Sequence, residues 1–437
     1  MNLTIHRGTH EIGGSCVEVS NKDSRIIIDI GMPISKKDGQ KFEIREYRHL
    51  DGPALVKEKI LPAIKGIYKW DKGNKPVDGL LISHAHIDHY GFSSYLRNNI
   101  HCYLGEGTRR LIELSSIFSD AKANIKSYTP IKSSQPFQVG SFTVTPHLMD
   151  HSAFDAHAFL IESEGKKIIY SGDFREHGRK PGALARFLKN VPEGVDALLL
   201  EGTLLGRDDE KHQTEEDIES EFVKIIKGSK SIVFATLSSQ NIDRLVSFYR
   251  ASLQAGRIFV IDAYTALILD ALHGLSKIPS PRSHTNLKVF FPKNLCDSLK
   301  RAGKWDMART SFGKYKVSRE WISQNRDRIV MIVRSSMVDS YLYRIAGINS
   351  SSTAVYSMWD GYLKEVSMEK LQAFFKQKGT SMIKLHTSGH APVATLKKVV
   401  DKTKPKMIIP IHTSSPERYK DFFPNVVEAK DGVSLKI

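Results

Sequence analysis

A short apolar segment that runs directly into a group of ligand-type side chains constrains the fold of this chain most. The run at residues 79–82 reads Gly-Leu-Leu-Ile, and Gly91 soon after it permits a tight turn into a helix. Within six positions after a single serine come four side chains that bind metals: His84, His86, Asp88 and His89. Histidines two positions apart lie on the same side of an extended chain. Imidazole and carboxylate are ligands of zinc and similar ions, so the segment predicts a metal site at the end of a buried strand.

The alternative is that these histidines are solvated loop residues. A single histidine would support only that interpretation, but four ligand-type residues in H-x-H-x-D-H order behind a strand favour a metal site. Such a set can hold two metal ions about 3.5–4 Å apart when other segments supply the remaining ligands. We therefore expect further ligands at the ends of other strands.

Several later strand ends offer such residues. A hairpin is predicted from 157–162 to 167–171; it begins soon after His151 and ends near Asp173, which places both at the same rim. His157 lies inside the hairpin strand and is interpreted as a packed histidine. Strands are also predicted at 197–200, 382–385 and 406–411, and they lead to Glu201, His390 and His412, respectively. Asp29, at the end of an earlier strand, is predicted to orient a ligand.

The middle of the chain has a different pattern. Between residues 206 and about 375, apolar strands alternate with amphipathic helices, which predicts a parallel, doubly wound α/β unit. The clearest of these elements are strands at 231–236, 257–261 and 328–333 and a helix over roughly 240–254. The predicted organisation is a metal-binding domain over 1–205 and 376–437, with the unit at 206–375 inserted into it.

Charge and composition restrict the partners. The net charge of +16 favours a polyanion such as RNA or DNA. No uncharged apolar run reaches the length of a membrane span, so no membrane partner is expected. The three cysteines, Cys16, Cys102 and Cys296, are an odd and scattered set that does not resemble a disulfide framework, and a cytoplasmic location is expected.

These motifs resemble the metallo-β-lactamase superfamily and, in the later part of the chain, its β-CASP branch of nucleases, with ribonuclease J the most similar. The motifs that carry the resemblance are H-A-H-I-D-H, D-H-S, S-G-D-F, E-G-T, H-T-S-G-H-A and P-I-H-T. The resemblance implies an α/β fold, in which a metallo-β-lactamase αββα sandwich carries an inserted β-CASP-like doubly wound domain. It also implies two divalent metal ions.

The resemblance assigns roles to particular residues. His84, His86 and His151 would hold one metal, and Asp88, His89 and His412 the other, with Asp173 bridging the two. Glu201 and His390 match the extra acid and histidine of the nuclease branch, and Ser388 and Gly389 would help to hold a phosphate. Zinc is the first expectation for this ligand set, and manganese is the alternative.

This residue set suits phosphodiester hydrolysis by a metal-activated water. We expect Asp88, His390 and Glu201 to be catalytic, with His390 protonating the leaving oxygen while Glu201 favours its charged form. Arg334 and Ser335 follow the strand at 328–333 and are candidate phosphate contacts.

The predicted activity is that of a metal-dependent ribonuclease acting on single-stranded RNA, with DNA as the weaker alternative. Exonuclease and endonuclease action both stay open, as does a homodimer. A hydrolase of a small ester, thioester or lactam would share the H-x-H-x-D-H segment, but it would not need the basic inserted unit. A non-catalytic RNA-binding subunit should have lost some of the seven ligands, and all of them are present.

Overall fold

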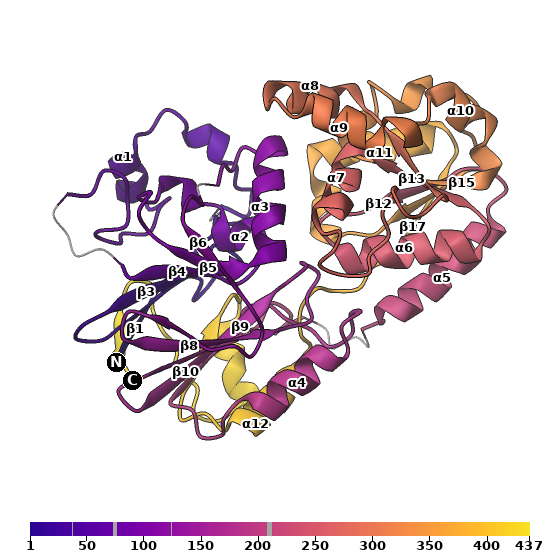
Figure 1. The fold of residues 1–437 in the computed structure, drawn as a ribbon. Coiled ribbons are helices and arrows are strands. Elements are labelled where there is room, and N and C mark those ends of the chain that lie inside the picture. Colours follow the sequence, from indigo (N-terminus) through magenta and orange to yellow (C-terminus); the bar gives the residue numbers. More distant parts are fainter. Residues whose placement is uncertain (37, 73–76, 124, 208–211) are drawn as a thin grey trace. The chain divides into compact units, whose positions relative to one another are not determined.

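The computed structural model describes residues 1–36, 38–72, 77–123, 125–207 and 212–437, and the chain divides into two units (Figure 1). The outer unit comprises Met1–Lys211 and Gly389–Ile437, and the inserted unit comprises His212–Ser388. The second boundary therefore lies after Ser388, and the expected boundary after residue 375 is wrong. Strand β17 (Ser381–Lys384) explains the difference, because it pairs with β16 (Thr353–Tyr356) in the sheet of the inserted unit.

The outer unit contains two sheets. The first has seven strands, in the order β19 (Ser434–Lys436), β1 (Asn2–Arg7), β2 (Cys16–Ser20), β3 (Arg25–Ile28), β4 (Gly79–Ile82), β5 (Cys102–Gly105) and β6 (Tyr128–Ile131). The second has six, in the order β18 (Ile408–Ile411), β11 (Ala197–Glu201), β10 (Lys166–Tyr170), β9 (His157–Ser163), β8 (Phe142–Leu148) and β7 (Phe137–Val139). The predicted run at 79–82 is β4, and all four of its residues are buried.

Apolar side chains from both sheets form one core, which includes Leu81 of β4 and Phe159 of β9. A second apolar cluster joins the other face of the second sheet to two helices, α4 (Gly182–Asn190) and α12 (Val393–Thr403). The remaining helices of this unit are α1 (Gly52–Lys57), α2 (Ile87–Tyr90) and α3 (Glu106–Phe118), and α3 lies beside the first sheet (Figure 1). These layers are the predicted αββα sandwich.

The inserted unit is built on one six-stranded sheet. Its strands lie in the order β14 (Leu287–Phe290), β13 (Ile258–Asp262), β15 (Ile329–Ile332), β12 (Val233–Thr236), β16 and β17, and every pairing is parallel. Its helices are α5 (Glu215–Gly228), α6 (Ile242–Gln254), α7 (Ala263–Ala271), α8 (Lys293–Arg301), α9 (Trp305–Phe312), α10 (Arg319–Gln324) and α11 (Val366–Gln377). This is the predicted doubly wound arrangement, and the carboxyl ends of all six strands meet at one edge.

The topology of the outer unit explains how distant residues meet. Strand β3 pairs in parallel with β4, and β11 pairs in parallel with both β10 and β18. Parallel neighbours end at the same edge of a sheet, so segments that follow these strands are brought together although they are far apart in sequence. Among the described residues, no helix combines the length and the apolar character that a membrane crossing requires.

Candidate metal centre

The first group of ligand-type side chains comes from the end of β4 and from the loop after β8. Its members are His84, His86 and His151, whose ligand atoms all lie within 4.8 Å of one another. His84 and His151 are fully buried, and His86 is partly exposed. Because three imidazoles converge without a carboxylate among them, this group offers three neutral nitrogen ligands.

The second group adds carboxylates. Its members are Asp88, His89, Asp173 and His412, all buried and with ligand atoms within 4.8 Å of one another. Asp88 Oδ2 lies 3.2 Å from His412 Nε2, and Asp173 Oδ2 lies 3.2 Å from His89 Nε2. The same Asp173 oxygen is 3.8 Å from His84 Nε2 in the first group. Asp173 therefore lies where the two groups meet, as its predicted bridging role requires.

Asp29 is the centre of a buried hydrogen-bond network beside the second group. Its Oδ2 atom is 2.8 Å from His89 Nδ1 and accepts hydrogen bonds from Ser83 Oγ at 2.7 Å and from Tyr170 Oη at 2.8 Å. Its Oδ1 atom accepts from the backbone N–H of Ser83. Asp29 adopts a left-handed backbone conformation, with φ of 58°. Such a conformation is uncommon outside glycine, although aspartate adopts it more readily than most residues, and the hydrogen bonds of Asp29 help to stabilise it.

Two other histidines are oriented through their second ring nitrogen. Thr203 Oγ1 lies 2.8 Å from His412 Nδ1, and the carbonyl oxygen of Gly389 lies 2.7 Å from His151 Nδ1. His412 is also left-handed, with φ of 54°. A partner on Nδ1 fixes the ring orientation and leaves Nε2 to face the cluster.

The electrostatics differ between the two groups. Burial, together with charge repulsion from neighbouring histidines, holds the pKa values of His84 and His151 well below the ordinary range. Burial likewise lowers the pKa of His86 to about 4. Burial would also lower the pKa of His89, but the carboxylates of Asp173, Asp29 and Asp88 raise it well above its usual value. The second group is therefore an acidic environment that favours a positive charge at its centre.

A second observation also indicates that these residues fit a divalent metal. Nε2 of His84 is buried and has no hydrogen-bond partner among the described residues, and the buried Nε2 of His89 faces the carboxylates of Asp173 and Asp88 at 3.2 and 3.8 Å. Burying a polar nitrogen without a partner is costly, and a metal ion would satisfy its lone pair. The donor set of imidazole and carboxylate is the one that zinc, manganese and iron accept. Divalent metal binding therefore fits both the geometry and the chemistry of the cluster.

A carboxylate–histidine pair borders the cluster. His390 Nδ1 lies 3.3 Å from Glu201 Oε1, and the rings of His390 and His412 stack with centroids 5.5 Å apart. Glu201 is buried, and its two oxygens accept backbone N–H groups from Thr203 and Ala391. Burial opposes protonation of His390, but the charge and hydrogen bond of Glu201 raise its pKa. The side chain of His390 is 19% exposed, so it is accessible from solvent.

The four predicted phosphate contacts are divided between the units. Gly389 belongs to the outer unit, where a Cβ atom at its position would lie 2.8 Å from Ser152 Oγ. Ser388, Arg334 and Ser335 belong to the inserted unit. Arg334 already donates from Nε to Asp262 Oδ2 at 2.5 Å and from Nη2 to Ser239 Oγ.

Four further residues support the cluster but were not predicted. Gly31 packs so closely that a Cβ atom there would lie 1.7 Å from the carbonyl oxygen of Asp88. The others are Ser83, Tyr170 and Thr203, which contact Asp29 or His412. Ser83 directly precedes His84, and Thr203 is the last residue of the E-G-T motif. These positions beside predicted site residues were the sequence signal that could have identified them. The contacts of Gly31 and Tyr170 are between segments far apart in sequence, and no sequence pattern indicates that these segments lie together.

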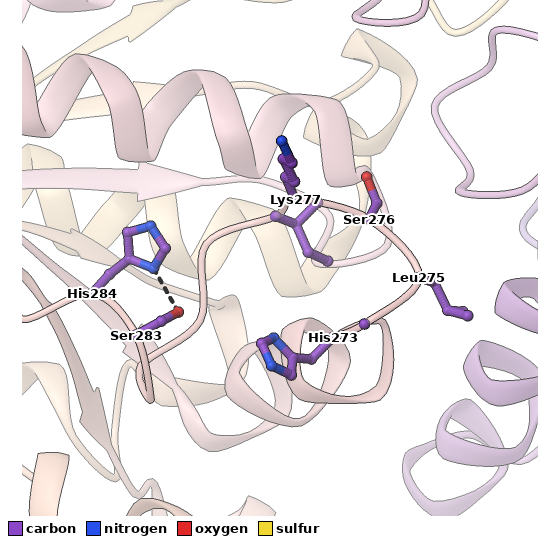
Figure 2. A pocket seen from close by; sticks show the side chains of 8 residues that line it. His273, Leu275, Ser276, Lys277, Ser283 and His284 are labelled. Carbon is purple, nitrogen blue, oxygen red and sulfur yellow. Dashed lines mark hydrogen bonds between the residues drawn. The ribbon is translucent and has the colours of Figure 1, made fainter.

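A surface pocket of about 550 Å³ in the inserted unit is lined by none of the predicted site residues (Figure 2). It is formed by the loop between α7 and β14, and His273, Lys277 and His284 are among its lining residues. Nδ1 of His284 lies 2.9 Å from Ser283 Oγ. No carboxylate is among the described lining residues, so the pocket lacks the mixed ligand set of the cluster.

Comparisons with known proteins agree with this architecture. A family model described as a Beta-lactamase superfamily domain matches residues 65–230. Ribonuclease J of Helicobacter pylori is 25% identical over 424 residues, which cover 94% of this chain and 56% of the relative. An RNase J-like protein of Methanocaldococcus jannaschii is 24% identical over 453 residues, covering 96% of this chain and 93% of the relative. A crystal structure of a protein of unknown function from Enterococcus faecalis superposes with a TM-score of 0.77 at 19% identity and covers 99% of both chains.

The fold and the ligand cluster together resemble those of the metallo-β-lactamase superfamily, and the cluster fits divalent metal binding. Within that superfamily, the relatives confirm the predicted resemblance to the ribonuclease J-like β-CASP branch. The chain spans little more than half the length of the Helicobacter ribonuclease J that it matches. The Enterococcus structure supports the fold alone.

Proposed function

We propose that this chain hydrolyses phosphodiester bonds of single-stranded RNA. The observation that carries the proposal is the meeting of two buried ligand groups at Asp173, with a glutamate-paired histidine at their border. Phosphodiester cleavage requires an activated water, neutralisation of phosphate charge and a proton for the leaving oxygen. The relatives named Ribonuclease J support RNA as the substrate class.

The seven predicted ligands would hold two divalent ions, with zinc as the first candidate and manganese as the second. When bound, such ions lower the pKa of a coordinated water and neutralise the attacked phosphate. Asp173 would contribute to both sites, because its Oδ2 atom lies within 4 Å of nitrogen atoms in both groups. Asp29 would hold His89 in its orientation, and Asp88 would complete the second site.

His390 is the proposed general acid. Its Nδ1 atom faces Glu201, so the imidazolium would donate an Nδ1 proton to that carboxylate in a hydrogen bond. The other nitrogen, Nε2, would then carry the proton that passes to the leaving oxygen. Glu201 itself accepts backbone N–H groups, which hold its carboxylate in position beside His390.

The phosphate contacts remain part of the proposal. Ser388 and the backbone of Gly389 lie immediately before His390 in the chain and would position the phosphate whose leaving oxygen receives the proton of His390. Arg334 and Ser335 would contact the RNA backbone elsewhere. Because Arg334 is already paired with Asp262, its contribution should be smaller than that of an unpaired arginine.

A gel assay tests the proposal. One single-stranded RNA and its DNA counterpart, each with a 5′-monophosphate or a 5′-hydroxyl, are incubated with the chain and with Asp88→Ala as control. The proposal predicts RNA cleavage that requires Asp88. Mononucleotides from the 5′-monophosphate form alone would identify a 5′ exonuclease, and internal fragments from both forms an endonuclease. Hydrolysis of small esters, thioesters or lactams without cleavage of either polymer would overturn the proposal.

A further inference from the structure

An exposed tryptophan follows β16 at the carboxyl edge of the parallel sheet in the inserted unit. Trp359 lies three residues after the end of β16 and begins a 3-10 helix, η7 (Asp360–Lys364). It is 45% exposed, whereas Trp70, Trp305 and Trp321 are all less exposed. Ligands of open α/β sheets bind beyond the carboxyl ends of the strands, so this is a favourable position for recognition.

The ring of Trp359 is held in place from several directions. A Cβ atom on Gly361 would lie 2.2 Å from the six-membered ring, so the indole packs directly on the Gly361 backbone. The ring of Tyr362 meets it edge-on, with centroids 5.4 Å apart and an interplanar angle of 87°. Tyr356 Oη donates a hydrogen bond of 2.8 Å to the carbonyl oxygen of Trp359. An exposed ring that is fixed in this way loses little entropy when a ligand stacks on it.

Two exposed lysines lie near the segment that carries Trp359, and one of them is paired with a carboxylate. Lys384 of the neighbouring strand β17 is paired in register with Tyr356, and its Nζ atom lies 2.7 Å from Asp360 Oδ2. Its side chain is 58% exposed. Lys364, at the other end of η7, is exposed as well. Aromatic rings flanked by lysines are the usual means of binding single-stranded nucleic acid, because bases stack on the rings while phosphates contact the cations.

We infer that Trp359 is a stacking platform for an unpaired base of single-stranded RNA, with Lys384 and Lys364 contacting the adjoining phosphates. This inference rests on the proposed function, because it assigns a binding subsite for the same substrate. It explains why a large aromatic side chain is exposed over a glycine. Single exposed apolar residues are common, so the inference depends on the rigid packing and the neighbouring charge rather than on exposure alone.

Fluorescence titration tests the inference. The full chain carrying Asp88→Asn, which prevents cleavage, is titrated with an oligouridylate of about ten nucleotides and with an abasic oligomer of the same length. Stacking should quench the Trp359 emission with the base-containing oligomer only. Trp359→Ala should weaken binding of the oligouridylate about tenfold, Trp359→Phe should retain most of the affinity, and both should bind the abasic oligomer as the parent does.

Leu253→Ala is the control, because Leu253 is a large apolar residue of the same unit with 47% exposure and no ring on which a base could stack. Equal oligouridylate affinities in Trp359→Ala and Leu253→Ala would overturn the inference, as would equal losses for the abasic oligomer. The cleavage assay with intact Asp88 is scored separately. If the chain cleaves RNA but Trp359→Ala binds the oligouridylate as tightly as the parent, only the assignment of Trp359 as a stacking platform is contradicted. If Trp359→Ala weakens binding but the chain with intact Asp88 does not cleave RNA, only the proposed activity is contradicted.

Discussion

At the scale of single residues, the ligand cluster is defined by what lies behind each histidine as much as by the histidines themselves. His89, His151 and His412 each have a partner on Nδ1, and these partners are a carboxylate, a backbone carbonyl and a threonine. His390 also has a carboxylate on Nδ1, but its partially exposed ring borders the cluster. His390 is proposed as the proton donor because it borders the cluster beside Glu201, and not because of its exposure, since the proposed ligand His86 is also partly exposed.

The different roles assigned to His390 and His412 predict different consequences for two substitutions. His412→Ala should lose bound metal and reduce RNA hydrolysis by orders of magnitude. His390→Ala should retain metal while hydrolysis falls by about 10²–10⁴, the usual contribution of a general acid. Elemental analysis of the purified variants, beside hydrolysis rates, measures both effects. Equal metal loss in the two variants would contradict the assigned roles.

Gly31 gives a second prediction at this scale. In Gly31→Ala the new Cβ atom would lie 1.7 Å from the carbonyl oxygen of Asp88, so the backbone that carries Asp88 must move. We expect a loss of about 1–3 kcal/mol in stability, as for other overpacked sites, and weaker metal binding. Gly228→Ala is the control, because no atom lies within 4 Å of the added group. Wild-type metal affinity in Gly31→Ala, measured by competition with a chelator, would show that this contact does not position Asp88.

The sequence identified the ligand-type residues because metal chemistry limits them to a few residue types behind strand ends. The structure brings together all seven, and Asp29, Glu201 and His390 lie beside them. Gly31 and Tyr170 could not be predicted in the same way. Their importance comes from the close approach of segments distant in sequence, which no local pattern encodes.

At the scale of secondary-structure elements, a buried ion pair joins two helices of the inserted unit. Arg244 of α6 and Glu215 of α5 are fully buried and form two hydrogen bonds, Nε to Oε2 at 3.1 Å and Nη2 to Oε1 at 3.0 Å. Arg244 Nη2 also donates to the carbonyl oxygen of Thr387 at 3.3 Å. The pair therefore connects both helices to the segment that follows β17.

Breaking this pair from one side should be costly. Arg244→Met leaves the buried carboxylate of Glu215 without its cation, and we expect a loss of about 3–5 kcal/mol, measured by urea denaturation. The double variant Arg244→Met/Glu215→Gln should recover part of that loss. Lys224→Ala, which removes an exposed pair with Glu221 on α5, should change stability by less than about 1 kcal/mol. Similar effects of Arg244→Met and Lys224→Ala would contradict the importance of the buried pair.

A carboxylate on an interior strand of the first sheet gives a prediction about pH. Burial opposes ionisation of Glu18 in β2, but hydrogen bonds from His6 and Arg25 lower its pKa to about 2. A carboxyl whose folded pKa is depressed stabilises the fold above its unfolded pKa, and this contribution disappears as the pH falls through the folded pKa. The destabilisation by Glu18→Gln should therefore be largest above about pH 4.5 and shrink toward pH 2. Urea midpoints that differ equally at pH 7 and pH 3 would contradict this.

Most elements follow from local patterns. The predicted strand at 79–82 is β4, and the predicted helix over roughly 240–254 is α6 (Ile242–Gln254). The assignment of 382–385 to the outer unit was wrong. An isolated strand does not reveal which sheet it will join, and β17 pairs with β16 although its carboxyl end leads to His390.

At the scale of the whole molecule, the outer unit supplies the ligand cluster and the inserted unit supplies exposed lysines and aromatic side chains. The inserted arrangement was predictable from the sequence, because strand-end histidines recur on both sides of a region with alternating strands and helices. The identity of the ions that the cluster would bind was not predictable, since the same ligands accept several metals, and neither were the RNA ends that the proposed activity would require. The net charge of +16 suits a polyanionic substrate.

The most direct test of phosphodiester hydrolysis at the metal centre is to remove the metal and then restore it. The chain is stripped with a chelator, its metal content is counted, and cleavage of a labelled single-stranded RNA is followed as zinc or manganese is added back. We predict that the stripped chain is inactive and that cleavage returns as two ions bind each chain, but not in Asp88→Ala. Cleavage by the metal-free chain, or no RNA cleavage by a chain that holds both ions, would contradict the proposed function.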